Sequence, residues 1–267
     1  MKSRVWILLA AIGVAVAAVF CFPAIPQSEA YHNFADKRVF FGVPNALNAL
    51  SNVFFLFVGI LGMRFSLRDE TKPGRAFIDS RERWPYFVFF VGIALTAFGS
   101  TYYHIRPNDS TLVWDRIPMA IGFMALVAAV TAERLSVRFG ASLLAPLAGL
   151  GVGSVLYWHF TQAAGDGDLR FYAIAQFGSL LAILLILALF PPRYTRGSDF
   201  IIALAIYGIA KIFEAADRQI FALVHIISGH TLKHLAAALS AYWIFRMLRL
   251  RVPVTSRAAV VSASAAE

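Results

Sequence analysis

Charged residues and cysteine are scarce in this chain of 267 residues, and each shortage excludes a class of protein. Charged side chains make up 15% of the sequence and hydrophobic ones 59%, with a mean hydropathy of +0.68. That balance is too apolar for a water-soluble globular protein of this length. A single cysteine, Cys21, excludes an intrachain disulfide. We therefore expect a lipid bilayer to be the solvent of most of the chain.

Long hydrophobic runs are what the sequence has in abundance. A membrane-spanning helix needs about 20 mostly apolar residues, and eight such runs are joined by short polar connections. The predicted spans are residues 5–22, 44–63, 84–103, 112–131, 141–160, 171–190, 199–216 and 220–247. Strand-like alternation is absent from them, so the pattern predicts an all-α, polytopic membrane bundle.

The basic residues, which give the chain a net charge of +9, follow every second connection. They gather at residues 2–4, 64–83, 134–138, 193–196 and 246–257, whereas the opposite connections carry few. The positive-inside rule places the basic connections in the cytoplasm, so this surplus indicates topology. Since aromatic and basic residues do not interleave in a patch, we expect no nucleic-acid partner.

The two ends of the chain differ from the seven spans between them. Residues 1–30 have the composition of a signal anchor, although Ser28-Glu29-Ala30 also resembles a signal-peptide cleavage site. Either alternative leaves Tyr31 outside and residues 31–250 as a seven-helix core. Residues 251–267, rich in Ala, Ser and Val, are predicted to be a disordered cytoplasmic tail.

Two histidines in the last predicted span are candidate metal ligands. His230 and His234 stand four residues apart, which places both imidazoles on one face of a helix. This spacing suits two ligands of one metal ion, but it also occurs by chance.

A second group of polar residues strengthens the prediction that His230 and His234 bind a metal ion. Ser100 and His104 share a helix face at the end of the third span, and Asp115 begins the fourth span after a short turn. The loop charges predict that His104, Asp115, His230 and His234 lie at one membrane face, the extracytoplasmic one. The alternative for Ser100 is a hydroxyl bonded to its own helix, and for Asp115 an interfacial ion pair.

Three imidazoles with an open fourth position describe a catalytic zinc site. His104, His230 and His234 would hold zinc, and water at the site would become a nucleophile near neutral pH. Asp115 would act as general base and then as acid, while Ser100 would stabilise an oxyanion.

The ordered set of Ser-x-x-x-His, Asp and His-x-x-x-His resembles the alkaline ceramidase family, whose superfamily also includes the progestin and adipoQ receptors. Residues 48–52, Asn-Ala-Leu-Ser-Asn, and 229–234, Gly-His-Thr-Leu-Lys-His, resemble further signatures of the ceramidase branch. The resemblance implies a zinc-dependent hydrolase that cleaves the amide bond of a ceramide-like lipid arriving from the bilayer. A sphingoid base and a fatty acid would be the products.

One segment departs from that family, and the sequence also allows alternative functions. Eukaryotic members bind calcium through an acidic segment before the first core helix, and here residues 31–36 contain one acid, Asp36, which makes calcium a doubtful cofactor. The alternative function is a receptor-like seven-helix protein with a structural zinc. An intramembrane zinc protease is disfavoured because the His-Glu-x-x-His motif is absent.

Overall fold

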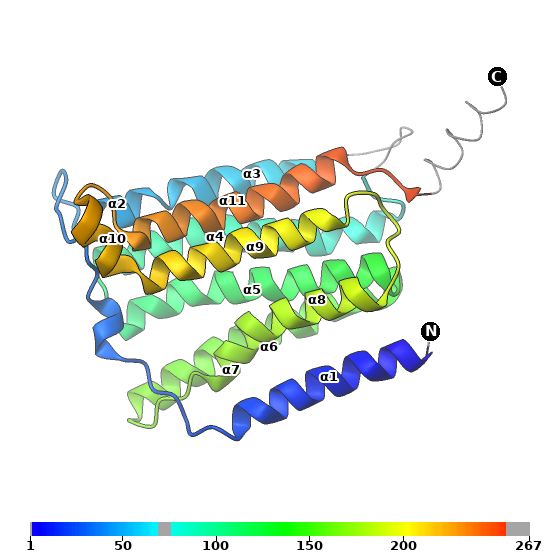
Figure 1. Cartoon of the computed structure of the whole chain (residues 1–267), viewed down its shortest axis with the longest axis horizontal. Helices are drawn as coiled ribbons and strands as arrows, with labels where there is room; N and C mark the ends of the chain where they lie inside the picture. The colour runs from blue at the N-terminus through cyan, green and yellow to red at the C-terminus, as the bar shows by residue number, and fades with distance from the viewer. Residues whose placement is uncertain (1, 69–75, 255–267) are drawn as a thin grey trace.

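The structure is a computed structural model that describes residues 2–68 and 76–254. Every regular element in these ranges is a helix, and the long helices run side by side as one bundle (Figure 1). The elements are α1 (Lys2–Phe20), η1 (Glu29–His32), α2 (Ala46–Leu50), α3 (Val53–Ser66), η2 (Ser80–Glu82), α4 (Arg83–Ile105), α5 (Asp109–Arg134), α6 (Val137–Ala163), α7 (Arg170–Ala173), η3 (Ile174–Gly178), α8 (Ser179–Leu189), α9 (Ser198–Ala215), α10 (Asp217–Val224) and α11 (Gly229–Leu250). The all-α prediction is confirmed.

The helices have the length and composition of membrane spans. Within residues 2–68 and 76–254, six helical segments are long and apolar enough to cross a membrane, and the bent pair α10–α11 makes up to seven. Large apolar side chains such as Phe57, Phe98 and Leu150 remain exposed on the outside of the bundle. A surface of this kind suits lipid rather than water, so the chain is a multi-pass membrane protein.

Helix α1 stands at the edge of the bundle. It contacts α8 and η3, and most of its residues are exposed within the chain. Arg4 donates a hydrogen bond to the carbonyl oxygen of Leu189 at the end of α8. Helix α1 is thus peripheral to the bundle that α2–α11 form.

The last predicted span, residues 220–247, is not one helix. Helices α10 and α11 meet at a bend of 111°, and His225 between them has a positive φ of 58°. The Ser228 side chain accepts a hydrogen bond from the Thr231 N–H and begins α11. Gly229 packs so closely against the backbone of Phe213 and Asp217 that a Cβ would collide with it. The break places His230 in the first turn of α11.

The turn between α4 and α5 brings two other candidate residues together. Asn108 forms a capping box with Thr111 at the start of α5. Gly99 lies against the Trp114 carbonyl, where a Cβ would clash, so the two antiparallel helices approach closely. His104 and Asp115 consequently lie at the same end of the bundle.

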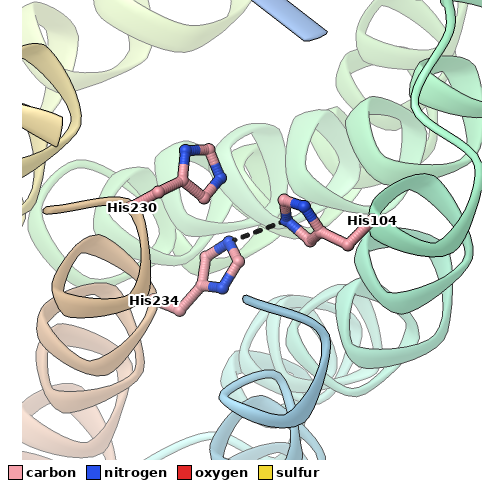
Figure 2. Close-up of side chains that lie close together, drawn as sticks. All are labelled: His104, His230 and His234. Atoms are coloured by element: carbon pink, nitrogen blue, oxygen red, sulfur yellow. Dashed lines mark hydrogen bonds between the residues drawn. The ribbon is translucent and has the colours of Figure 1, made fainter. Parts of the chain in front are cut away.

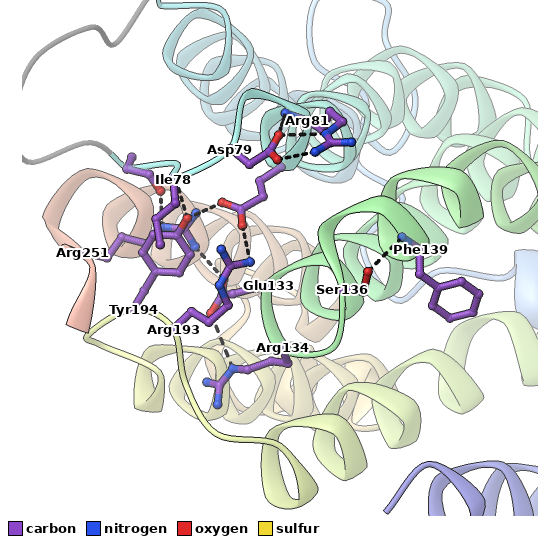
Figure 3. Close-up of polar contacts among 12 residues, drawn as sticks. Ile78, Asp79, Arg81, Glu133, Arg134, Ser136, Phe139, Arg193, Tyr194 and Arg251 are labelled. Atoms are coloured by element: carbon purple, nitrogen blue, oxygen red, sulfur yellow. Dashed lines mark hydrogen bonds and ion pairs between the residues drawn. The ribbon is translucent and has the colours of Figure 1, made fainter. Parts of the chain in front are cut away.

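The opposite end contains a buried carboxylate–arginine cluster (Figure 3). Glu133 accepts hydrogen bonds from Arg251 at 2.6 Å and from Tyr86 at 3.0 Å. Glu82 pairs with Arg193 at 2.9 Å and accepts a hydrogen bond from Tyr194. The cluster joins the start of α4, the end of α5, the α8–α9 connection and the segment after α11.

The contacts of this cluster correct the prediction for the C-terminal tail. Arg251 is buried and donates to the Ala76 carbonyl, and Pro253 forms a β-bridge with Tyr194. The prediction that residues 251–267 are disordered is therefore wrong for residues 251–254, because Arg251 has a buried carboxylate partner. Residues 255–267 lie outside the described ranges.

Candidate metal centre

Three histidines from two helices converge at one end of the bundle (Figure 2). His104 lies in the last turn of α4, and His230 and His234 lie in the first two turns of α11. All three are buried, and one potential ligand atom from each lies within 4.8 Å of the other two. They form a group that could hold a metal ion, as the sequence predicted.

One distance and one unpaired nitrogen fit a metal ion. The Nε2 atoms of His104 and His234 lie 3.3 Å apart. Two imidazole nitrogens bound tetrahedrally at about 2.0–2.1 Å from zinc would be separated by about 3.3–3.4 Å. The His230 Nε2 atom is buried and has no hydrogen-bond partner among the described residues. His104 and His234 thus present nitrogens at the spacing of two ligands, and His230 presents a nitrogen that the described protein leaves unsatisfied.

Hydrogen bonds to the second nitrogen orient His234. Its Nδ1 atom lies 3.1 Å from the Asn48 carbonyl oxygen and 2.8 Å from the Ser51 hydroxyl. A carbonyl oxygen can only accept, so Nδ1 carries the proton and Nε2 keeps its lone pair. This arrangement is the usual way in which a protein fixes the tautomer of a metal-binding histidine.

The backbone of the other two histidines is also held in place. The His230 N–H donates to Asp217 at 2.7 Å, and the same carboxylate accepts from the Ala35 N–H at 2.9 Å. The side chain of Asn45 donates to the His104 carbonyl at 2.8 Å. These bonds tie the ligand-bearing helices to the segment that precedes α2.

Ser100 and Asp115 lie beside the histidine group. Both are buried, and the Ser100 hydroxyl lies close enough to the Asp115 carboxylate to interact with it. Together with His234 they line one cavity. The structure therefore brings the three histidines together and places Ser100 and Asp115 on one cavity with His234.

An aromatic side chain covers the site from the N-terminal segment. The Phe34 ring lies 4.7 Å from the rings of both His104 and His230, measured between ring centroids. Phe34 is buried and packs with Tyr103 in an apolar cluster. This cover lowers the access of water to the histidines from that side.

The cavity has a polar end and an apolar end and a volume of about 320 Å³. The polar end is lined by Tyr31, Ser100, Asp115, Arg116, Lys211, Glu214, Lys233 and His234. The apolar end extends between α4, α5, α8, α9 and α11 and is lined by residues that include Phe89, Leu126, Ile183, Phe200 and Ile244. A molecule with a hydrocarbon chain and a polar group matches this division.

Other polar residues lie outside the three-histidine group. Glu214 pairs with Lys211 and Lys233 at the polar end of the cavity, and Tyr31 donates to it at 3.2 Å. His225 is exposed at the bend before α11. Asp36 accepts two hydrogen bonds from Arg38, and this guanidinium holds the pKa of the Asp36 carboxyl below its usual range.

Asn48 and Ser51, which the sequence indicated only as part of the resemblance of residues 48–52, support the histidine group through hydrogen bonds. Asn48 accepts hydrogen bonds from Ser228 and Thr231 at the start of α11, whereas Ser51 contacts His234 directly. Their three-residue spacing in an apolar helix was the available signal. The cover by Phe34 and the place of Arg116 in the cavity had no comparable signal, because both depend on the packing of residues 22–36.

Comparison with protein-family models gave no match, and comparison with curated proteins gave none either. The geometry of the site is therefore the basis for any functional conclusion.

Proposed function

We propose that this protein is a membrane-embedded, zinc-dependent amidohydrolase of lipid amides. The observation that carries the proposal is a group of three buried histidines, one of which, His234, lines a cavity together with Ser100, Asp115 and a long apolar end. The resemblance to alkaline ceramidases supplies a ceramide-like lipid as the first substrate to test.

Each residue has a role that follows from its chemistry. His104, His230 and His234 would hold zinc, which supplies a Lewis acid that activates water and polarises a carbonyl group. Asp115 takes the proton of the attacking water and delivers it to the amide nitrogen as the C–N bond breaks. Ser100 turns from Asp115 to donate a hydrogen bond to the carbonyl oxygen of the substrate. A fatty acid and an amine are released.

The cavity and the loop charges support a lipid that arrives from the bilayer. The apolar end of the cavity would take the acyl chain, and burial of that chain supplies binding free energy. Arg64 and Arg249 lie in the last turns of α3 and α11, and Arg193 follows α8, all at helix ends opposite the histidines. The positive-inside rule then puts the metal site at the extracytoplasmic face and the C-terminus in the cytoplasm.

The decisive experiment measures metal content and amide hydrolysis in the same purified preparations. Wild type is expected to contain one zinc per chain and to cleave a ceramide in detergent. His230→Ala should lose both zinc and activity, whereas Asp115→Asn should keep zinc and lose about 10²–10⁴-fold in turnover.

Two results would contradict the proposal. Absence of stoichiometric zinc from the wild-type protein would contradict the proposed zinc-dependent catalysis. Zinc-loaded wild type that cleaves no lipid amide would favour the receptor-like alternative, in which the same three histidines hold a structural metal. His159→Ala is a matched control, because His159 lies on α6 and is not part of the three-histidine group.

A further inference from the structure

The polar end of the cavity has more cationic than anionic side chains. Three of its lining residues are basic, namely Arg116, Lys211 and Lys233, and two are acidic, Asp115 and Glu214. The two lysines share Glu214, at 3.0 Å in the case of Lys233. The cavity therefore has a surplus of one positive charge before any metal ion adds its own.

Arg116 lacks a carboxylate partner in spite of its burial. It is 6% exposed, and among the described residues no ion pair joins it to an acid. Its Nη2 atom donates to the Gln27 side-chain oxygen at 2.5 Å, and its Nη1 atom has no hydrogen-bond partner in the same part of the chain. The neighbouring Asp115 carboxylate interacts with the Arg116 charge but forms no ion pair or hydrogen bond with it in the described chain.

Aromatic rings hold the Arg116 guanidinium in place. Its Cζ atom lies 4.2 Å from the Trp158 ring centroid, 4.8 Å from that of Tyr172 and 5.6 Å from that of Tyr31. Tyr31, Tyr172 and Arg116 line the cavity, whereas Trp158 is fully buried and does not. Cation–π contacts stabilise a cation but do not neutralise it. Ionised groups at membrane depth are ordinarily paired or face a cavity that takes a charged ligand.

We propose that the preferred substrate is an acidic lipid amide of the N-acyl amino acid class, and that Arg116 binds its carboxylate. This inference rests on the proposed hydrolase function. Asp115 and Arg116 both line the polar end of the cavity, so a carboxylate close to the scissile nitrogen would share that end with both side chains. The acyl chain occupies the apolar end of the cavity, which leaves the amino-acid part at the polar end.

In the metal-free cavity, the charge of the lining residues favours a carboxylate over a phosphate. A guanidinium can bind either group with parallel hydrogen bonds. A carboxylate brings one negative charge, which equals the surplus of the metal-free cavity, whereas a phosphate monoester brings close to two. Hydrolysis breaks the amide C–N bond, joins the water oxygen to the acyl carbon and places a proton on the nitrogen, so a fatty acid and a free amino acid are formed.

The test compares two amides that differ in one group. N-palmitoylglycine carries a carboxylate where N-palmitoylethanolamine carries a neutral hydroxymethyl group. Binding of both to chelator-treated, full-length protein in nanodiscs is measured by Trp fluorescence, and turnover of both is measured with the zinc-loaded protein. We expect wild type to bind the glycine amide at least about tenfold more tightly, in line with the strength of a charge-assisted hydrogen bond.

Variants of Arg116 assign that preference to one side chain. Arg116→Gln should bind the two amides equally, and Arg116→Lys should keep part of the preference and show that a folded site survives replacement. Arg170→Gln is the matched control, since Arg170 pairs with Asp168 at the same end of the bundle but does not line the cavity. It should behave as wild type.

The outcomes separate this inference from the proposed function. Equal binding of the two amides to wild type, or a preference that Arg116→Gln retains, overturns the inference even if both amides are cleaved. N-palmitoyl-phosphoethanolamine bound more tightly than the glycine amide also overturns it, in favour of a phosphate ligand. If wild type prefers the carboxylate amide but cleaves neither amide, the result would support carboxylate binding by Arg116 and contradict the proposed hydrolase activity.

Discussion

The two ends of the bundle bury polar side chains in opposite ways. In the carboxylate–arginine cluster, Glu82 and Glu133 each pair with a guanidinium, and the segment after α11 is fixed by those pairs. In the candidate metal centre, imidazole nitrogens face one another, and two of them, His104 Nδ1 and His230 Nε2, have no partner in the described chain. Oppositely charged groups that pair with one another hold a fold together, whereas uncharged ligand atoms that converge without partners are suited to bind a ligand.

The first prediction concerns the carboxylate–arginine cluster. Glu133→Gln leaves Arg251 buried without its counter-charge, and removing one partner of a buried pair typically lowers the free energy of unfolding by about 3–5 kcal/mol. Thermal unfolding in detergent should show the loss, while zinc content per folded chain stays at the wild-type value.

Asp79→Asn is the control for that experiment, because Asp79 pairs with Arg81 where both side chains are partly exposed. Its effect on unfolding should be small. Loss of zinc from Glu133→Gln at unchanged stability would show that the two ends are not separate in function.

The second prediction concerns the oxyanion role of Ser100. Ser100→Ala should keep zinc and lower the turnover number by about 10²–10³-fold, the usual loss when one oxyanion donor is removed. Ser154→Ala should leave turnover unchanged, because that buried hydroxyl donates to the Gly151 carbonyl of its own helix. A loss of zinc from Ser100→Ala would instead make Ser100 a positioning residue for the ligands.

The third prediction tests the support of His234 by α2. Ser51→Ala should weaken zinc binding by about 10–100-fold, since bonds to the second nitrogen of a ligand usually contribute that much. Competition with a chelator of known affinity measures the change. Ser66→Ala is the control on the same membrane span, where the hydroxyl donates to the Gly62 carbonyl far from the histidines. Equal zinc affinity in Ser51→Ala and wild type would contradict the role.

The smallest predicted effect is that of acid on the segment before α2. Hydrogen bonds from Arg38 lower the pKa of Asp36 in the folded protein below its unfolded value of about 3.9. Their stabilisation is therefore complete above about pH 4 and is lost as the pH falls through the folded pKa. The unfolding midpoint of wild type should drop below pH 4 more steeply than that of Asp36→Asn. Parallel curves would show that the pair contributes nothing.

Much of the architecture could be predicted because the bilayer imposes a strong rule on sequence. Apolar runs of about 20 residues gave the helices that span the membrane, and residues four apart gave the helix faces of His104 with Ser100 and of His234 with His230. The break before α11 could not be read from hydropathy. The hydropathy of residues 220–247 allows one long span, and the bend arises where Gly229 packs against the backbone of α9 and α10.

The sequence by itself determined that this chain lies in a membrane as helices and which five side chains could form a metal-dependent site. Tertiary structure decided what surrounds them: the hydroxyl and carbonyl that fix the His234 tautomer, the Phe34 cover, and an Arg116 without a counter-ion beside Asp115. The reason is physical. Hydropathy and helical spacing act between near neighbours in the chain, whereas burial, partners and charge balance depend on segments that are distant in sequence and meet only in the folded bundle.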